Sequence, residues 1–139
     1  MALQHELDMS FNYDPVTFGE IKEGVGENLT DTGQKILENA KRTDKSFADV
    51  LQRIEGRNSR FNEMIVWNED ICPTIHNHGH YRGDDKCKFT LEDYRNAQTF
   101  PRDYAFESKA QAAYVCGMSV PPLMIKRIVQ RLIDSGVFE

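Results

Sequence analysis

The chain has 139 residues, of which 40% are hydrophobic and 28% are charged, and this composition excludes a collagen-like, low-complexity or wholly disordered protein. The formal net charge is -5, but residues 33–60 carry seven bases and four acids, so the total does not exclude DNA binding by a local surface. No apolar run reaches the roughly 18 residues of a transmembrane helix, and the first residues lack the pattern of a secretory signal. We therefore expect a globular cytoplasmic protein, in a prokaryotic cytosol or nucleoid, with no membrane partner.

The first part of the chain predicts a linker followed by two helices. Residues 1–30 contain one proline and three glycines with little periodicity, so we expect at most one short turn of helix, over 17–22. Apolar residues then recur at helical spacing in two groups, which predicts two helices within residues 31–55. Ser46 or Asp44 can cap the second of these helices.

The middle of the chain changes to a strand pattern. β-branched and aromatic residues bounded by polar turns predict short strands over 64–67 and 71–76. Residues 79–85 are polar and are expected to form a loop.

Three helices are predicted in the last part of the chain. Thr90 begins a helix that runs to about residue 98, before Pro101, and a short helix follows over 108–113. The last helix follows two prolines, is amphipathic, closes at Gly136 and is expected to dock on a core. Together the segments predict an α+β fold, a small region of short strands and helices followed by C-terminal helices.

The histidines form the most distinctive cluster of candidate ligands. His76, His78 and His80 alternate and would share one face of a strand, together with Cys72. Zinc sites rarely use alternate positions of one strand without a second pair of ligands elsewhere, so we expect no metal. The alternatives are a solvent-exposed polar strand end or a hydrogen-bonding surface that includes Arg82.

Two ordered sets of residues stand in the second half of the chain. The first set is Phe89, Thr90, Gln98, Phe100, Pro101 and Tyr104. The second set is Gln111, Gly117, Ser119, Val120, Pro121 and Pro122. They resemble conserved blocks IX and X of the DNA cytosine-5 methyltransferases, and Pro73-Thr74-Ile75 resembles an element of the family's target-recognition region. Departures from the family pattern occur at Glu92-Asp93 and Arg95-Asn96, where the family has ion-pairing residues, and at Met118, where it has an asparagine.

The resemblance implies a division of the chain into a leading linker (1–30), a target-recognition region (31–86) and the helices of blocks IX and X (87–139). The family's catalytic cysteine, its catalytic glutamate and its cofactor loop precede the recognition region, and none of the three motifs is found in this sequence. We therefore expect no catalytic residue in this chain. A larger catalytic subunit would complete a heterodimer, and its Rossmann-like methyltransferase domain would be completed by the C-terminal helices of this chain.

The resemblance also implies sites for S-adenosyl-L-methionine and double-stranded DNA. The cofactor, shared with the larger subunit, would be contacted by Met118, Ser119 and Val120. Amides at the start of the last helix and the Ser119 hydroxyl would suit a carboxylate, unless Ser119 only caps a helix. DNA would be contacted by Thr74, His76, His78, His80 and Arg82.

The expected activity is methylation of cytosine in a specific DNA sequence, which protects that sequence from a cognate restriction endonuclease. The alternative is a stand-alone DNA-binding or regulatory remnant of a methylase. In the family, the apolar face of the last helix packs onto the catalytic domain, so we expect the isolated chain to expose this face.

Overall fold

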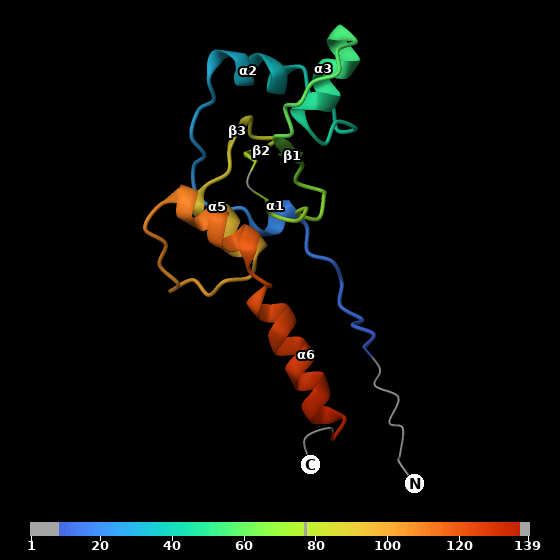
Figure 1. Cartoon of the computed structure of the whole chain (residues 1–139), viewed down its shortest axis with the longest axis vertical. Helices are drawn as coiled ribbons and strands as arrows, with labels where there is room; N and C mark the ends of the chain where they lie inside the picture. The colour runs from blue at the N-terminus through green and yellow to red at the C-terminus, as the bar shows by residue number, and fades with distance from the viewer. Residues whose placement is uncertain (1–8, 77, 137–139) are drawn as a thin grey trace.

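A computed structural model of the chain describes residues 9–76 and 78–136 (Figure 1). In these residues, short helices surround a small sheet, and a long helix extends away from it. The elements in chain order are α1 (Phe18–Ile21), α2 (Asp31–Glu38), α3 (Phe47–Glu55), β1 (Met64–Val66), β2 (His80–Arg82), β3 (Cys87–Lys88), α4 (Leu91–Ala97), α5 (Lys109–Met118) and α6 (Pro122–Asp134). The predicted mixed α+β class is confirmed.

The sheet has the order β1-β2-β3, with β1 parallel to β2 and β2 antiparallel to β3. The strand predicted over 64–67 is therefore confirmed as β1, but the prediction over 71–76 is wrong, because that segment is irregular. The loop predicted over 79–85 is also wrong in part, since it contains β2. Its residues look like a loop because they are polar, but two of them, His80 and Arg82, lie in the interior.

Side chains that alternate along β1 separate two hydrophobic cores. Val66 faces a core formed with α1, α4 and α5, in which the rings of Phe18 and Phe89 stack with centroids 4.7 Å apart. Ile65 and Trp67 face a second core, formed with α2 and α3. The molecule therefore has an α2–α3 lobe on one side of the sheet and an α4–α5 lobe on the other (Figure 1).

The helix ends follow local capping rules. Capping boxes stand at the starts of α1, α3 and α4, and their N-cap residues are Thr17, Ser46 and Thr90. The helices predicted within 17–22 and 31–55 and after Thr90 are thus confirmed, and Ser46 rather than Asp44 is the cap. Helix α5 is longer than predicted, since it continues to Met118.

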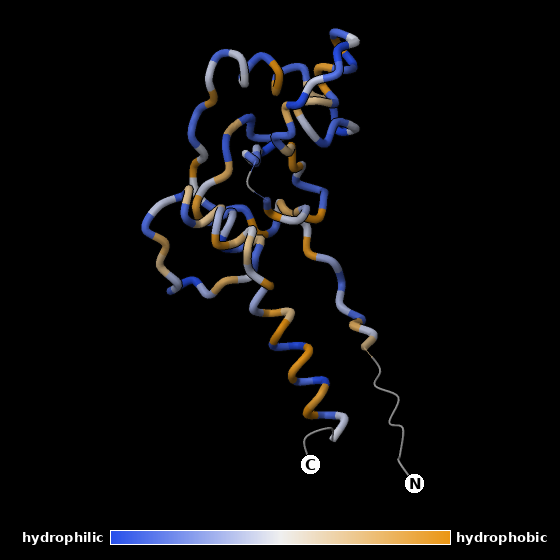
Figure 2. Tube along the Cα trace, in the orientation of Figure 1, coloured by the Kyte–Doolittle hydropathy of each residue, from blue (hydrophilic) through white to orange (hydrophobic). Residues whose placement is uncertain are grey.

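Helix α6 is amphipathic as predicted, but the expectation that it docks on a core is wrong within this chain. None of its described residues is buried, and it points away from the sheet (Figure 1). Orange and blue alternate along its turns in Figure 2, as in an amphipathic helix, and several of its large apolar residues are exposed. Its described neighbours include the chain near Tyr13, whose ring lies 3.6 Å from the Arg127 guanidinium carbon.

Contacts cross the expected boundaries between regions. Phe18, in the expected linker, is fully buried, and β2 pairs with β3 across the boundary at residue 86. The linker and the recognition region therefore share one core with the block IX helix. No helix in the described parts of the chain combines the length and hydropathy required to cross a bilayer.

Candidate DNA- and cofactor-binding site

A buried ion pair organises the centre of the candidate site. Arg82 donates two hydrogen bonds of 2.8 Å to the carboxylate of Asp93, one to each oxygen. The same carboxylate accepts a hydrogen bond from the Thr90 amide at 2.9 Å. Asp93 therefore completes the capping box of α4 and also forms the ion pair with Arg82. Arg82 is 4% exposed and Asp93 is fully buried. The expected contact between Arg82 and DNA does not agree with this placement, because reaching a base would leave Asp93 charged and unpaired.

Arg82 also fixes the chain that leads from α1 toward α2. Its guanidinium donates to the carbonyl oxygens of Glu23 at 2.7 Å and Gly24 at 3.0 Å. The Thr90 hydroxyl donates to the Glu23 carbonyl as well, at 2.8 Å. Arg82 is therefore a positioning residue that joins three segments distant in sequence.

His80 lies in an aromatic environment in the interior. It is 1% exposed, and its ring packs against those of His76, Phe89 and Tyr94, with centroids 4.7 to 5.6 Å apart. Burial, with a smaller contribution from the neighbouring His76, lowers the pKa of His80 to about 4. Neither ring nitrogen has a partner at full hydrogen-bonding geometry in the described residues, although nearby backbone groups favour the protonated form slightly. The expected contact between His80 and DNA is therefore not supported by its position.

The other expected DNA-contacting residues lie closer to solvent. Thr74 and His78 are exposed, and His76 is half-buried. The His78 amide donates to Nδ1 of His76 at 3.1 Å, and burial lowers the pKa of His76. The lowered pKa favours the neutral form of His76, which offers one donor and one acceptor. The described residues contain no group of three or more His, Cys, Asp or Glu side chains placed to hold a metal, and the expectation of no metal stays a prediction.

The segment that carries these residues packs directly on α5. Ile75 is buried in the core with Ala112 and Cys116 of that helix. A Cβ atom at Gly117 would lie 3.3 Å from the Ile75 carbonyl oxygen, a tight contact that would require this backbone to move slightly away from the helix. The candidate DNA-contacting segment therefore lies against the helix that ends at Met118, one of the expected cofactor contacts.

The three expected cofactor residues follow one another at the end of α5. Met118 is 75% exposed and Val120 is 52% exposed, so both can contact a ligand. The Ser119 hydroxyl donates to the Cys116 carbonyl at 3.2 Å, which makes Ser119 the cap of α5. The side chain of Gln98 holds the turn in place by donating to the Ser119 carbonyl at 2.7 Å.

The start of α6 does not form the expected carboxylate site. Pro121 and Pro122 have no N–H, the Leu123 amide donates to the Thr99 hydroxyl, and the Met124 amide donates to the Pro121 carbonyl. The first amides that could bind an anion are therefore absent or occupied. Met118 and Val120 leave an exposed apolar surface beside this turn, and their contact with S-adenosyl-L-methionine stays a prediction.

Several of these partners are not signalled by sequence. Asp93 belongs to the acid pair Glu92-Asp93, which looks exposed in the sequence, and nothing local indicates that its partner is Arg82, eleven residues earlier.

The thiols show no activation, because burial raises the pKa of Cys72 to about 12 and of Cys116 to about 11, and it also raises that of Cys87.

Comparisons with known proteins agree with the blocks described above. The family model for C-5 cytosine-specific DNA methylases matches residues 9–134, which includes the described strands and helices. Comparison with curated proteins finds no match, and neither does comparison with solved structures. Because the match covers nearly the whole sequence, the chain belongs to the C-5 cytosine-specific DNA methylase family.

Proposed function

We propose that this chain is the target-recognition subunit of a two-chain DNA cytosine-5 methyltransferase in a restriction-modification system. The family methylates cytosine in DNA and generally uses S-adenosyl-L-methionine. Chemistry on a base requires that the base leave the stack, so both recognition and catalysis are needed around one flipped cytosine. The larger partner supplies the catalytic cysteine and glutamate, and this chain supplies recognition and one wall of the cofactor pocket.

The observation that carries the proposal is the apolar face of α6, which has no core to cover it among the described residues. An amphipathic helix of this length is normally stabilised by packing, and a large exposed apolar surface marks an interaction site. The exposed face therefore supports a protein partner outside this chain. The apolar side chains of this helix that are exposed are Leu123, Met124, Ile125, Val129 and Ile133.

The thiols support an external nucleophile. A cysteine attacks as its thiolate, and reactive cysteines have lowered pKa values. All three cysteines here have raised pKa values because of burial, and Cys72 precedes Pro73, the reverse of the order Pro-Cys. The catalytic thiolate is accordingly assigned to the larger subunit.

The residues of this chain then have distinct roles. Thr74, His76 and His78 contact DNA, with Thr74 facing a phosphate. His80 and Arg82 lie behind them and hold the segment and its neighbours in place. Met118 and Val120 contact S-adenosyl-L-methionine, while Ser119 shapes the turn that presents them.

Reconstitution tests this function. The larger chain, identified by its Pro-Cys and Glu-Asn-Val motifs in a neighbouring reading frame, is purified separately and mixed with this chain, and transfer of labelled methyl groups to duplex DNA is measured. We expect no activity from either chain alone and activity from the mixture, with loss of activity when the partner's cysteine is replaced by serine. Duplex binding by this chain that the larger chain neither changes nor converts to methylation would instead favour a stand-alone DNA-binding remnant.

A further inference from the structure

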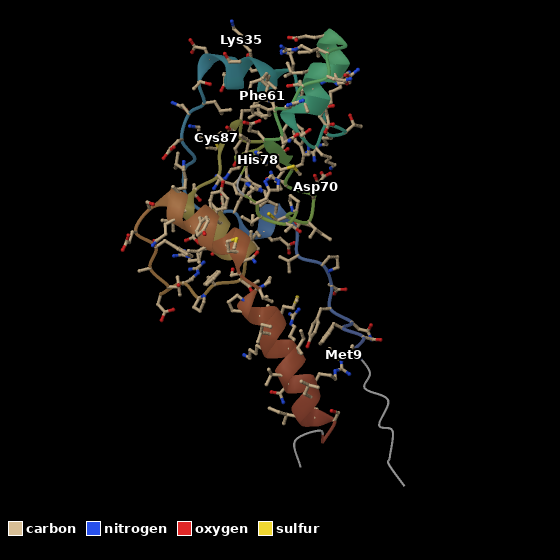
Figure 3. All side chains as sticks on the ribbon, viewed as in Figure 1. Met9, Lys35, Phe61, Asp70, His78 and Cys87 are labelled. Carbon is tan, nitrogen blue, oxygen red and sulfur yellow. The ribbon has the colours of Figure 1, made fainter. Side chains whose placement is uncertain are left out.

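A cavity of the α2–α3 lobe is lined by segments that lie far apart in sequence. Its volume is about 330 Å³, at the small end of the range for ligand pockets. Its walls include the rings of Phe47, Phe61 and Tyr81. The rings of Phe47 and Tyr81 pack with centroids 4.6 Å apart, and Phe61 is 47% exposed. Figure 3 shows Phe61 in this lobe, at the end of the molecule opposite α6. The cavity therefore offers an aromatic surface to one small apolar group.

A carboxylate oxygen of a residue that lines this cavity has no partner. Oε2 of Glu63 is buried, and no hydrogen-bond donor of the described residues reaches it. Among the described residues, only His80 and Arg95 also keep a buried side-chain nitrogen or oxygen in this state. A buried charged oxygen without a donor costs free energy. Its presence beside a cavity therefore favours a ligand that donates a hydrogen bond to it.

Lys88 brings the opposite charge to the same cavity. The hydrogen bond from Lys109 at 2.6 Å, with a smaller contribution from Lys88, lowers the pKa of Glu27, so the acid nearest to Lys88 in charge is already bound. The ion pairs of the described residues include none between Glu63 and Lys88. Other lysines, such as Lys35, also lack a carboxylate partner, but they do not line this cavity. An acid and a base that share a cavity without pairing match a ligand that carries both an ammonium and a carboxylate group.

We propose that this cavity binds a free α-amino acid with an aromatic side chain. The ammonium group of the ligand donates to Glu63, its carboxylate accepts from Lys88, and its ring lies against Phe61 and Tyr81. A cavity of this size holds a single amino acid rather than a larger cofactor. The residues proposed to contact DNA and S-adenosyl-L-methionine do not line it, so the site goes beyond the proposed function.

Tyr81 connects the cavity to the rest of the fold. It stands between His80 and Arg82 in β2, and its ring packs at the edge of the α2–α3 core. An occupant of the cavity therefore contacts the strand that joins the two lobes. A ligand that binds only the folded chain raises the stability of that chain, so occupancy should raise the temperature of thermal unfolding.

Calorimetric titration of the full chain with three matched compounds tests the site. L-phenylalanine carries both charged groups, phenethylamine carries only the ammonium group, and 3-phenylpropionate carries only the carboxylate. We expect L-phenylalanine to bind roughly tenfold more tightly than either of the other two, and to raise the unfolding temperature of the chain. The absence of L-phenylalanine binding at millimolar concentration, or equal affinities for the three compounds, would overturn the proposal.

Two substitutions that each remove one charge should give opposite binding profiles. E63Q should weaken binding of L-phenylalanine and phenethylamine roughly tenfold and leave that of 3-phenylpropionate no weaker. K88M should weaken binding of L-phenylalanine and 3-phenylpropionate and leave that of phenethylamine no weaker.

Matched controls and the compound series keep the test decisive. E38Q and K35M change exposed residues of α2 outside the cavity lining, and neither should alter any affinity. Equal losses for all three compounds in E63Q, or losses in E38Q and K35M as large as those in E63Q and K88M, would overturn the assignment of the two charges. If a variant fails to fold, the three compounds on the unsubstituted chain still decide the proposal. None of these outcomes affects methylation by the reconstituted pair, so the proposed function is tested separately.

Discussion

Strand β2 and helix α6 place polar and apolar side chains in opposite ways. In β2, a charged arginine and a histidine lie in the interior, where Asp93 neutralises the arginine and aromatic rings surround the histidine. In α6, large apolar side chains lie at the surface, and none of the described residues of the helix is buried. The difference teaches that side-chain polarity alone does not decide location. The partners of the β2 side chains lie within this chain, whereas the partner proposed for α6 is another chain.

The largest expected effect is loss of the buried charge partner in β2. D93A removes the carboxylate that binds buried Arg82 through both oxygens, leaves only Asp85 at 3.3 Å, and removes one of the two hydrogen bonds of the α4 capping box, so we expect the free energy of unfolding to fall by about 3 to 5 kcal/mol. Urea denaturation of the full chain measures this change. D85A removes the more exposed carboxylate near Arg82 and should cost less than about 1 kcal/mol. Equal losses in the two variants would contradict the central role of the Arg82–Asp93 pair.

The second effect is a pH dependence caused by His80. Its folded pKa of about 4 lies below the ordinary 6.5, so the unfolded chain binds the proton first as the pH falls. Stability is therefore fully present above about pH 6.5 and decreases by about 3 kcal/mol as the pH approaches 4. Denaturation at a series of pH values should show this loss in the unsubstituted chain and in H78L, and a much smaller loss in H80L. The same pH profile in H80L and H78L would exclude His80 as the cause.

A third, intermediate effect concerns the packing of the DNA-contacting segment on α5. G117V places a branched side chain against the Ile75 backbone, and overpacking of this kind costs about 1 to 3 kcal/mol. A110V, on an exposed position of the same helix, is the control for introducing valine, since helix propensity alone would destabilise A110V more than G117V. We expect thermal unfolding to show a larger loss for G117V than for A110V. Comparable losses would show that the close approach at Gly117 is not important.

The smallest expected effect on stability is in α6. I125Q replaces an exposed apolar residue, so the isolated chain should change by less than about 0.5 kcal/mol. The same variant should bind the larger subunit more weakly, which a sedimentation or titration experiment measures. A variant that is destabilised alone but binds the larger subunit normally would place the partner of α6 within this chain.

The elements that sequence predicts well are those whose signals are local. Ser46 and Thr90 cap helices through residues three positions away, so α3 and α4 can be located from spacing alone. The amphipathic pattern of α6 is local as well. Strand β2 could not be predicted, because an arginine is buried only when its charge is paired. The carboxylate that pairs with Arg82 belongs to Asp93, which only the fold brings near.

The candidate site shows the same division. The order of residues from Phe89 to Pro122 identifies the family, but it does not show which side chains reach solvent. Thr74 and His78 are exposed as a DNA contact requires, whereas His80 and Arg82, of the same polar segment, face inward. The cap made by Ser119 depends on two hydrogen bonds. Its hydroxyl donates to the Cys116 carbonyl, and its own carbonyl accepts from the Gln98 side chain, which comes from another helix end.

Hydrogen exchange of the α6 amides, with and without the larger subunit, tests the central claim most directly. A 13-residue helix without a core to pack on is marginally stable in water. We predict rapid exchange along α6 in the isolated chain and strong protection in the complex, while β2 is protected in both. Equal protection of α6 in the two samples would contradict the claim that its apolar face is completed by another chain.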